Sequence, residues 1–463
     1  MKIIILGAGN VGFELAKYLV NAGHAVTLVD NESEGLTTAA SRLDLRVVTG
    51  NPASPDILRN AGAENAELLV AATPDDETNI TACSVGAFLF RIPRKIARIR
   101  LSDYLREADN LFGPHAIPID HIISPEHIIT KNICDLIELP GITAVGSCFN
   151  GRVLIASVRV AIGGKLLGQS VSKFENYDSK ATALALYRNG KQVKDFKKDV
   201  FKTGDTLYFC CERDRALSQL AAVVPLQTAL TDVTIAGGSH IADALARTLS
   251  ERYRVKLIES DATRAQRSAS ALYDTDVQVF HGNPVDIEFL HEEHIQDTHL
   301  FIAATANDEK NIMASLILGR LHKVRTLAVL RDASYYDLAR GEHSEIDTII
   351  SPQESTISAL LSNIRQEGVE STTLFRQGDS EAIELTLEGS KLGSHVIGRK
   401  IEAINFPQGI SLGLILRGRR ILVPSPDLVF ESGDRILAYL PKHNLMRPLV
   451  KLCRPHSFWI PKW

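Results

Sequence analysis

Short apolar runs alternate with segments of helical periodicity along the first 140 residues. A run at residues 3–6 leads into residues 11–19, where apolar side chains recur at helical spacing, and a second run follows at residues 25–29. Further runs follow polar or amphipathic intervals at residues 45–49, 68–72, 96–100 and 119–123. Strands that alternate with helices predict right-handed βαβ units and therefore a doubly wound parallel sheet.

A glycine-rich turn joins the first predicted strand to the first predicted helix. It reads Gly7-Ala8-Gly9-Asn10-Val11-Gly12. Gly7 permits the tight turn, Gly9 lets backbone N–H groups approach a pyrophosphate, and Gly12 lets helix and strand pack closely. The pattern predicts a dinucleotide site formed by Gly7, Ala8, Gly9, Asn10 and Val11. The alternative is that the glycines only shape a turn.

Asp30 ends the second predicted strand, where a dinucleotide site requires an acid. Its carboxylate is placed to accept hydrogen bonds from ribose hydroxyls and would repel a 2′-phosphate. We therefore expect NAD or NADH as the cofactor rather than NADP.

The pattern changes between residues 141 and 226. Strand-like runs at residues 153–160, 183–187 and 206–210 are separated by turns, and little helical periodicity remains. This segment predicts a small α+β lobe without a glycine-rich phosphate loop.

The second half of the chain repeats the first half in unbroken order. Residues 233–237 repeat the first strand, residues 257–259 repeat residues 28–30, and residues 303–309 repeat residues 71–77. The small lobe recurs as well, so we predict a tandem duplication. The predicted divisions are a Rossmann-like lobe at 1–140, a small lobe at 141–226, a second Rossmann-like lobe at 231–366, a second small lobe at 367–450, and a basic, tryptophan-containing tail at 451–463.

Two further segments in the first half contain candidates for ligand contact. Thr73, with Pro74 beside it, follows a strand whose carboxyl end faces the expected cleft. A plain turn is the alternative role for Thr73. Arg98 and Arg100 alternate with apolar residues and are expected on one face of a buried strand, where a charge needs a partner. That partner is either an anionic ligand or a structural carboxylate.

Composition and charge exclude several classes of protein. The 463 residues are 45% hydrophobic and 23% charged with a net charge of −4, which argues against a nucleic-acid binder. No apolar run approaches the ~20 residues that span a bilayer, and the first strand leaves no room for a signal peptide. A cytoplasmic location is therefore expected.

The cysteines and acidic clusters do not predict a metal site. No two of the six cysteines have C-x-x-C spacing, and the adjacent Cys210 and Cys211 are expected on opposite faces of a strand, so all six are predicted to be reduced, small apolar residues. The acids at residues 75–77 suit the first turn of a helix, where the macrodipole stabilises them.

In combination and in duplicate, these motifs resemble the peripheral NAD-binding subunits of Trk potassium-uptake systems, which are tandem RCK-domain (regulator of potassium conductance) proteins. The resemblance covers nearly the whole chain and rests on the glycine turn, Asp30, and residues 71–79, 96–100 and 118–126. It implies a homo-oligomer, a tetramer, that binds nicotinamide or adenine nucleotides on the cytoplasmic face of the inner membrane. Its implied partner is a membrane-embedded TrkH- or TrkG-like potassium channel subunit, and the family pattern assigns Arg98 to the ligand.

The second half departs from the pattern at its glycine turn. The turn reads Gly237-Gly238-Ser239-His240-Ile241-Ala242, so Ser239 stands at the position of Gly9, where its Cβ obstructs a pyrophosphate. Glu259 still offers a ribose acceptor. Residues 237–241 and Glu259 are therefore a second candidate site, which binds weakly, binds a smaller nucleotide such as ADP or ATP, or is only structural.

Two functions fit these patterns. The leading hypothesis is a nucleotide sensor without enzymatic activity, which favours different domain arrangements with different ligands. The alternative is an NAD-dependent oxidoreductase, but no histidine lies between residues 141 and 226 to serve as its acid or base.

Overall fold

The computed structural model describes residues 1–113, 115–139, 141–177, 180–225, 230–332, 334–335, 339, 346–364, 369–375, 379–391 and 393–454. These residues form two compact units. The first unit contains Met1–Ile128, most of the helix that starts at Pro352, and His443–Pro448, and the second contains nearly all the rest. Over the described ranges, no helix combines the length and the apolar character required to cross a membrane.

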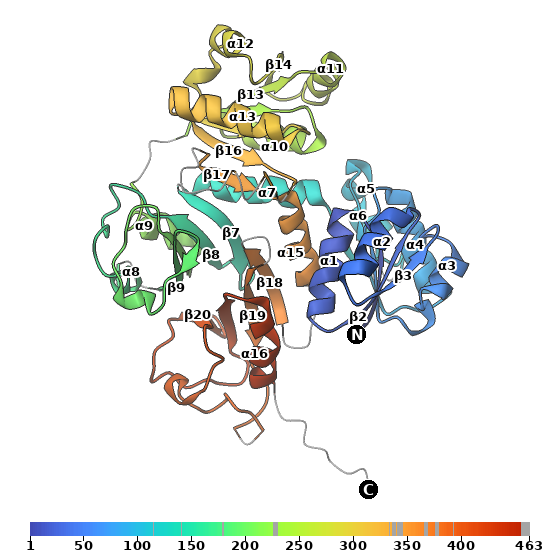
Figure 1. The fold of residues 1–463 in the computed structure, drawn as a ribbon, viewed down its shortest axis with the longest axis vertical. Helices are drawn as coiled ribbons and strands as arrows, with labels where there is room; N and C mark the ends of the chain where they lie inside the picture. Colours follow the sequence, from blue (N-terminus) through green and yellow to red (C-terminus); the bar gives the residue numbers. More distant parts are fainter. Residues whose placement is uncertain are drawn as a thin grey trace. The chain divides into compact units, whose positions relative to one another are not determined.

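The first N-lobe, within Met1–Ile128, is built on a parallel sheet of six strands with helices between them (Figure 1). Its strands are β1 (Lys2–Leu6), β2 (Ala25–Asp30), β3 (Arg46–Thr49), β4 (Leu68–Ala71), β5 (Arg94–Arg98) and β6 (His121–Ile123). Its helices are α1 (Asn10–Asn21), α2 (Ser33–Arg42), α3 (Pro55–Asn60), α4 (Asp76–Phe88), α5 (Ser102–Arg106) and α6 (Ala108–Leu111). The strand order β3-β2-β1-β4-β5-β6 reverses between β1 and β4, and doubly wound sheets bind ligands at that reversal.

The second N-lobe repeats this topology. Its strands are β12 (Asp232–Ala236), β13 (Arg254–Glu259), β14 (Gln278–His281), β15 (Leu300–Ala303), β16 (Arg325–Val329) and β17 (Thr348–Ile350). Its helices are α10 (His240–Ser250), α11 (Ala262–Ala271), α12 (Ile287–Glu292) and α13 (Asp308–Leu316). The order β14-β13-β12-β15-β16-β17 matches the first sheet strand for strand.

Each N-lobe is followed by a C-lobe with a five-stranded antiparallel sheet. The first C-lobe contains β7 (Ile142–Cys148), β8 (Val153–Arg159), α8 (Ser172–Glu175), β9 (Ala181–Arg188), β10 (Lys191–Gln192), β11 (Thr206–Glu212) and α9 (Ala216–Leu220). The second contains β18 (Val369–Phe375), β19 (Ser380–Thr386), β20 (Ser411–Arg417), β21 (Arg420–Leu422) and β22 (Arg435–Leu440). The orders β10-β9-β11-β8-β7 and β21-β20-β22-β19-β18 are equivalent, so the predicted fold class is confirmed.

A buried ion pair fixes the same corner of both C-lobes. Arg188 donates two hydrogen bonds, of 2.8 and 2.9 Å, to the carboxylate of Asp205. Arg417 makes the same bidentate pair with Asp434, at 2.8 Å for both bonds. Because both carboxylates are almost fully buried, these paired hydrogen bonds compensate the cost of removing the charges from water.

The two C-lobe sheets pack against each other through an aromatic cluster. Tyr208 lies 5.5 Å from Phe375 and 5.2 Å from Tyr439 between ring centroids, and the hydroxyls of Tyr187 and Tyr439 are 3.2 Å apart. Cys210 belongs to this cluster, whereas Cys211 faces the other core, which confirms that the two thiols point to opposite faces. All six cysteines are free thiols.

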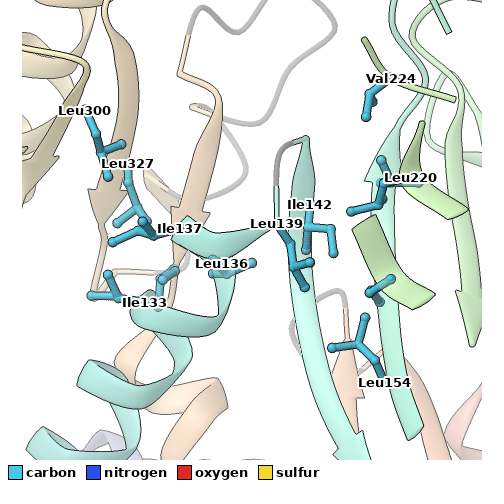
Figure 2. Packing of buried hydrophobic residues seen from close by; sticks show 14 of the residues in the cluster. Ile133, Leu136, Ile137, Leu139, Ile142, Leu154, Leu220, Val224, Leu300 and Leu327 are labelled. Atoms are coloured by element: carbon cyan, nitrogen blue, oxygen red, sulfur yellow. The ribbon is translucent and has the colours of Figure 1, made fainter. Parts of the chain in front are cut away.

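Helix α7 (Pro125–Glu138) follows the first N-lobe but packs on the sheet of the second. Figure 2 shows Ile137 beside Leu327, in one core that also contains Ile133 and Leu300. Past the helix, Leu139 and Ile142 continue the same core toward the first C-lobe. Arg325, at the start of β16, donates hydrogen bonds to the carbonyls of Leu136 (3.0 Å) and Ile137 (3.4 Å), which a helix end leaves without partners.

Two late segments of the chain lie with the first N-lobe. Most of helix α15 (Pro352–Asn363) belongs to that unit. Met446, the first residue of α16 (Met446–Cys453), accepts a hydrogen bond from the hydroxyl of Tyr18, and Arg447 donates to the carbonyl of Ala22 at 2.9 Å. The two tryptophans of the predicted tail lie outside the described residues.

We expect Arg325→Ala to lower the free energy of unfolding of the second unit by about 1–3 kcal/mol, because the buried carbonyls at the end of α7 lose their donors. Thermal denaturation and amide hydrogen exchange of α7 measure this loss. Arg254→Ala is the control, since Arg254 is 81% exposed on the same sheet and should change stability by less than about 0.5 kcal/mol. Equal effects of the two substitutions would contradict the assignment.

Candidate functional site

The three glycines of the first turn have different structural roles. Gly7 has a φ of +105°, and a Cβ on it would lie 2.9 Å from the carbonyl oxygen of Ala72. A Cβ on Gly12 would lie 1.9 Å from the carbonyl oxygen of Gly7. A Cβ on Gly9 would meet no atom within 4 Å, and its backbone is extended with φ −66°. Gly7 is therefore required by its backbone conformation, and Gly12 by its close contact with the turn in this lobe, although the second lobe has Ala242 at the matching position. Gly9, in contrast, keeps a space beside the turn open.

That open space lies at the amino end of α1. Gly9 is the N-cap residue and provides no side-chain hydrogen bond, and the first turn carries no acid. Helical hydrogen bonding begins with Phe13, whose N–H donates to Gly9 at 2.9 Å. The amides of Asn10 and Val11 precede that bond, so they are available to an anion at the helix end.

Asp30 holds the glycine turn in place. Its carboxylate accepts hydrogen bonds from the backbone N–H groups of Ala8 (2.5 Å) and Glu32 (2.9 Å). Each carboxylate oxygen has two lone pairs, so Asp30, which is only partly buried, keeps the capacity to accept further hydrogen bonds from a ribose. The structure therefore brings Asp30 to the turn, as the sequence predicts.

The loop after β4 contributes a hydrogen-bonded turn rather than a free hydroxyl. The hydroxyl of Thr73 lies 2.8 Å from the amide oxygen of Asn79, and Thr73 is only 6% exposed. The amide nitrogen of Asn79 donates to the carbonyls of Thr73 and Arg98 at 3.0 and 2.9 Å. This supports the turn alternative for the Thr73 side chain, while Pro74 is exposed beside it.

Arg98 ends strand β5 with a guanidinium that lacks a partner at one donor. Its Nε is buried and has no hydrogen-bond partner, and no ion pair joins it to a carboxylate among the described residues. Burial lowers the pKa of Arg98, and the neighbouring charge of Arg100 lowers it further. A buried donor that the protein leaves unsatisfied, at the carboxyl edge of the sheet, fits contact with an anionic ligand.

The prediction that Arg100 shares the strand with Arg98 is wrong. Strand β5 ends at Arg98, because the buried carboxylate of Asp76 accepts the N–H groups of Arg100 (2.9 Å) and Leu101 (2.8 Å). The side chain of Arg100 instead pairs with Glu126 at 3.1 Å. Sequence alternation alone could not reveal that a distant acid ends the strand.

The second N-lobe has the same backbone arrangement around its glycine turn, but with different side chains. Gly237 has a φ of +121° and packs against Ala304, as Gly7 packs against Ala72. The hydroxyl of Ser239 accepts a hydrogen bond from the N–H of Ala242 at 3.3 Å, so a side chain caps α10. His240 and Ile241 begin this helix, with His240 exposed and Ile241 packed against the core.

Glu259 stands at the position equivalent to Asp30, but its carboxylate accepts more hydrogen bonds from the protein than that of Asp30 does. It accepts hydrogen bonds from the N–H groups of Gly238 (2.6 Å) and Asp261 (2.8 Å), and Arg264 pairs with it at 2.9 Å. Although burial opposes it, these hydrogen bonds hold the pKa of Glu259 below its usual range. Glu259 is 5% exposed, so it offers less to a ribose than Asp30 does.

Two residues that position the loops of the two candidate sites were not singled out from sequence. Asn79 and its counterpart Asn311 tie the loops after β4 and β15 to the next strand. The repeat contained this signal, because both asparagines stand six residues after the repeated threonine.

No group of three or more metal-ligating side chains occurs in the ranges described. Asp75, one of the acids at residues 75–77, caps α4 through the N–H of Thr78 at 2.8 Å.

Comparison with known proteins identifies close relatives over the full length. A family model described as TrkA-N domain matches residues 3–125 and 233–352, and one described as TrkA-C domain matches residues 391–449. The chain is 40% identical over 462 residues to the Trk system potassium uptake protein TrkA of Haemophilus influenzae, covering 99% of this chain and all of that protein. It is 36% identical to the protein of the same name from Vibrio alginolyticus, with the same coverage.

Solved structures share the fold at low sequence identity. The GsuK RCK domain matches with a TM-score of 0.60 and 16% identity, covering 98% of this chain and 94% of that one. The GsuK channel bound to NAD matches with the same TM-score and identity, covering 98% of this chain and 78% of that one. These matches establish the RCK fold of the chain.

We expect Gly9→Ser to preserve or slightly raise thermal stability while weakening NADH binding at least tenfold. The added hydroxyl caps α1, as Ser239 caps α10, but occupies the open space. Gly12→Ala is the matched comparison: its methyl group collides with the turn and should destabilise the protein by about 1–3 kcal/mol. Denaturation and isothermal titration calorimetry separate the effects, and a large loss of stability in Gly9→Ser would contradict the role of Gly9.

We expect Arg98→Val to leave thermal stability equal or higher, because the substitution removes a desolvated charge that has no ion pair. Valine is the residue at the matching position of the second lobe, position 329. NADH affinity should fall at least tenfold in calorimetric titration. Arg106→Ala, which removes an exposed arginine of the same lobe, is the control and should change neither quantity. Loss of stability with unchanged binding would show that Arg98 is structural.

Proposed function

The chain belongs to the TrkA family of Trk potassium-uptake proteins, and on that premise we propose that it binds NAD or NADH in its first N-lobe and signals this occupancy to a membrane potassium channel subunit. As a member of this family it is a regulatory protein of potassium uptake and not an enzyme. The oxidoreductase alternative is therefore set aside.

The nucleotide assignment rests on the open space beside Gly9. A glycine that no protein atom requires stands at the amino end of a helix whose N-cap provides no side-chain hydrogen bond. A pyrophosphate would use this space, and the amides of Asn10 and Val11 would donate to its oxygens. The GsuK channel, whose fold is similar, has been solved bound to NAD, which supports this choice of ligand.

Asp30 and Arg98 would complete the first site. The carboxylate of Asp30 would accept the ribose hydroxyls and repel a 2′-phosphate, so NADH would bind more tightly than NADPH. The Nε of Arg98, which has no hydrogen-bond partner among the residues that the structure describes, would donate to the anionic part of the ligand. Thr73 and Pro74 would border the nucleotide through the loop that packs against Gly7.

Regulation requires only that ligands bind two arrangements of the protein unequally. A ligand with equal affinity for both arrangements shifts nothing, however tightly it binds. We propose that the reader of this difference is a TrkH- or TrkG-like channel subunit. The protein would act as a homo-oligomer, a tetramer, on the cytoplasmic face of the inner membrane.

We expect the purified protein to bind NADH in the first lobe without consuming it. Asp30→Ala should weaken binding at least tenfold, because it removes both the ribose acceptor and the anchor of the turn. Glu259→Ala is the matched control in the second lobe and should leave NADH affinity unchanged. Calorimetry and the absorbance of the dihydronicotinamide ring are the measurements. Equal losses from the two substitutions, or NADH oxidation coupled to a small substrate, would overturn the proposal.

A further inference from the structure

Helix α1 contacts a segment from the far end of the chain. Residues 443–448 follow the last strand of the second C-lobe, but they belong to the same compact unit as the first N-lobe. The ring of His443 lies 4.2 Å from the ring of Tyr18 between centroids, and the hydroxyl of Tyr18 donates to the sulfur of Met446 at 3.5 Å. Tyr18 and Met446 are only 8% and 3% exposed, so this contact is closely packed.

Arg447 binds the carboxyl end of α1. Its Nε donates a hydrogen bond of 2.9 Å to the carbonyl of Ala22, the C-cap residue of the helix. The last turn of α1 contains no basic residue, so Arg447 supplies the positive charge that stabilises a helix carboxyl end. Gly23 makes room for it, because a Cβ on Gly23 would lie 1.2 Å from Nη2 of Arg447. Any side chain at position 23 would therefore displace the guanidinium.

The equivalent positions of the other two lobes do not make this contact. The second N-lobe has Thr248 where the first has Tyr18, and the exposed Thr248 hydroxyl donates to a carbonyl of its own helix at 2.9 Å. The first C-lobe has Leu217 at the position of Met446, and Leu217 is 51% exposed. The contact is therefore particular to the lobe proposed to bind NADH and is not a consequence of the repeated fold.

The two ends of α1 thus have different partners. Its amino end presents the amides of Asn10 and Val11 beside the open space at Gly9, and its carboxyl end is held by Arg447. The helix has 12 residues and is about 18 Å long. Because a helix moves on its sheet as one body, contacts that fix its carboxyl end also fix the amides at its amino end.

We propose that residues 443–448 position α1 for NADH, so that NADH binding and the docking of this segment strengthen each other. A phosphate at the amino end and Arg447 at the carboxyl end are both favoured by the dipole of the same helix. The coupling is reciprocal by linkage, since a segment that favours the ligand is favoured by the ligand to the same extent. The proposal rests on the proposed function of the first site and concerns its regulation.

The chain continues from this segment into the second unit. Helix α16 begins at Met446, and from Leu449 onward its residues belong to that unit. Docking of residues 443–448 therefore joins the second unit to the helix that would bind the pyrophosphate. Tyr18 and Arg447 act on the ligand only through α1, so both are positioning residues.

Gly23→Asn tests the contact at the carboxyl end of α1. Gly23 has a φ of +78°, which asparagine adopts more readily than most residues, whereas its Cβ must displace Arg447. Calorimetric titration of the full chain should show NADH binding at least fivefold more weakly. Gly62→Asn is the matched control in the same lobe: Gly62 has a φ of +89°, and a Cβ there meets no atom within 4 Å. It should change NADH affinity by less than twofold.

Arg447→Met is the second variant, because it removes the donor and the charge but keeps an unbranched apolar side chain. Arg447 is exposed, so thermal denaturation should change little, while NADH affinity should again fall at least fivefold. Hydrogen exchange then measures the reciprocal effect. Saturating NADH should slow exchange of the backbone amides of residues 443–453 at least threefold in the unsubstituted protein and in Gly62→Asn, but not in Arg447→Met.

Two results would overturn this proposal and leave the proposed function intact. The first is an NADH affinity that is within twofold of the original, or higher, in both Gly23→Asn and Arg447→Met. The second is NADH binding to the unsubstituted protein without slower exchange in residues 443–453. Absence of NADH binding to the unsubstituted protein would refute the proposed function of the first site, and the coupling with it.

Discussion

A hydrogen bond between the glycine turn and the acid at the end of the second strand supports both N-lobes. The N–H of Ala8 donates to Asp30 at 2.5 Å, and the N–H of Gly238 donates to Glu259 at 2.6 Å. Each bond joins residues more than twenty positions apart and is strengthened by the carboxylate charge. The acid therefore positions the turn through the protein's own backbone, and the same side chain is the proposed acceptor for a ribose.

The two copies adjust the size of this contact in a compensating way. Glu259 is one methylene longer than Asp30, and the turn residue opposite it is Gly238 where the first lobe has Ala8. A Cβ on Gly238 would lie 3.0 Å from the Cγ of Glu259, which leaves little room for the alanine of the first lobe. Two substitutions thus preserve one contact, while the surrounding polar groups of the two lobes differ.

The hydrogen bonds that the two N-lobes share extend beyond the glycine turn. The differences between the two sites are therefore confined to a few side chains. Asn79 and Asn311 make the same hydrogen bonds, and Asp76 and Asp308 receive the same pairs of backbone N–H groups. At other positions the second lobe differs from the first: Ser239 replaces Gly9, Val329 replaces Arg98, and Arg264 and Lys310 add positive charge. The shared hydrogen bonds maintain the fold, and the replaced positions change the space and the charge beside each glycine turn.

The sequence by itself determined the periodicities, the duplicated order of elements, the glycine turn and Asp30, because each depends on residues that are close together in the chain. The tertiary structure alone decided what surrounds each glycine, namely the backbone of Ala72 near Gly7 and the open space beside Gly9. It also decided that β5 ends before Arg100, that α7 packs on the second sheet, and that Arg264 and Lys310 share a cleft. These features depend on partners that lie far apart in sequence, so local patterns contain no record of them.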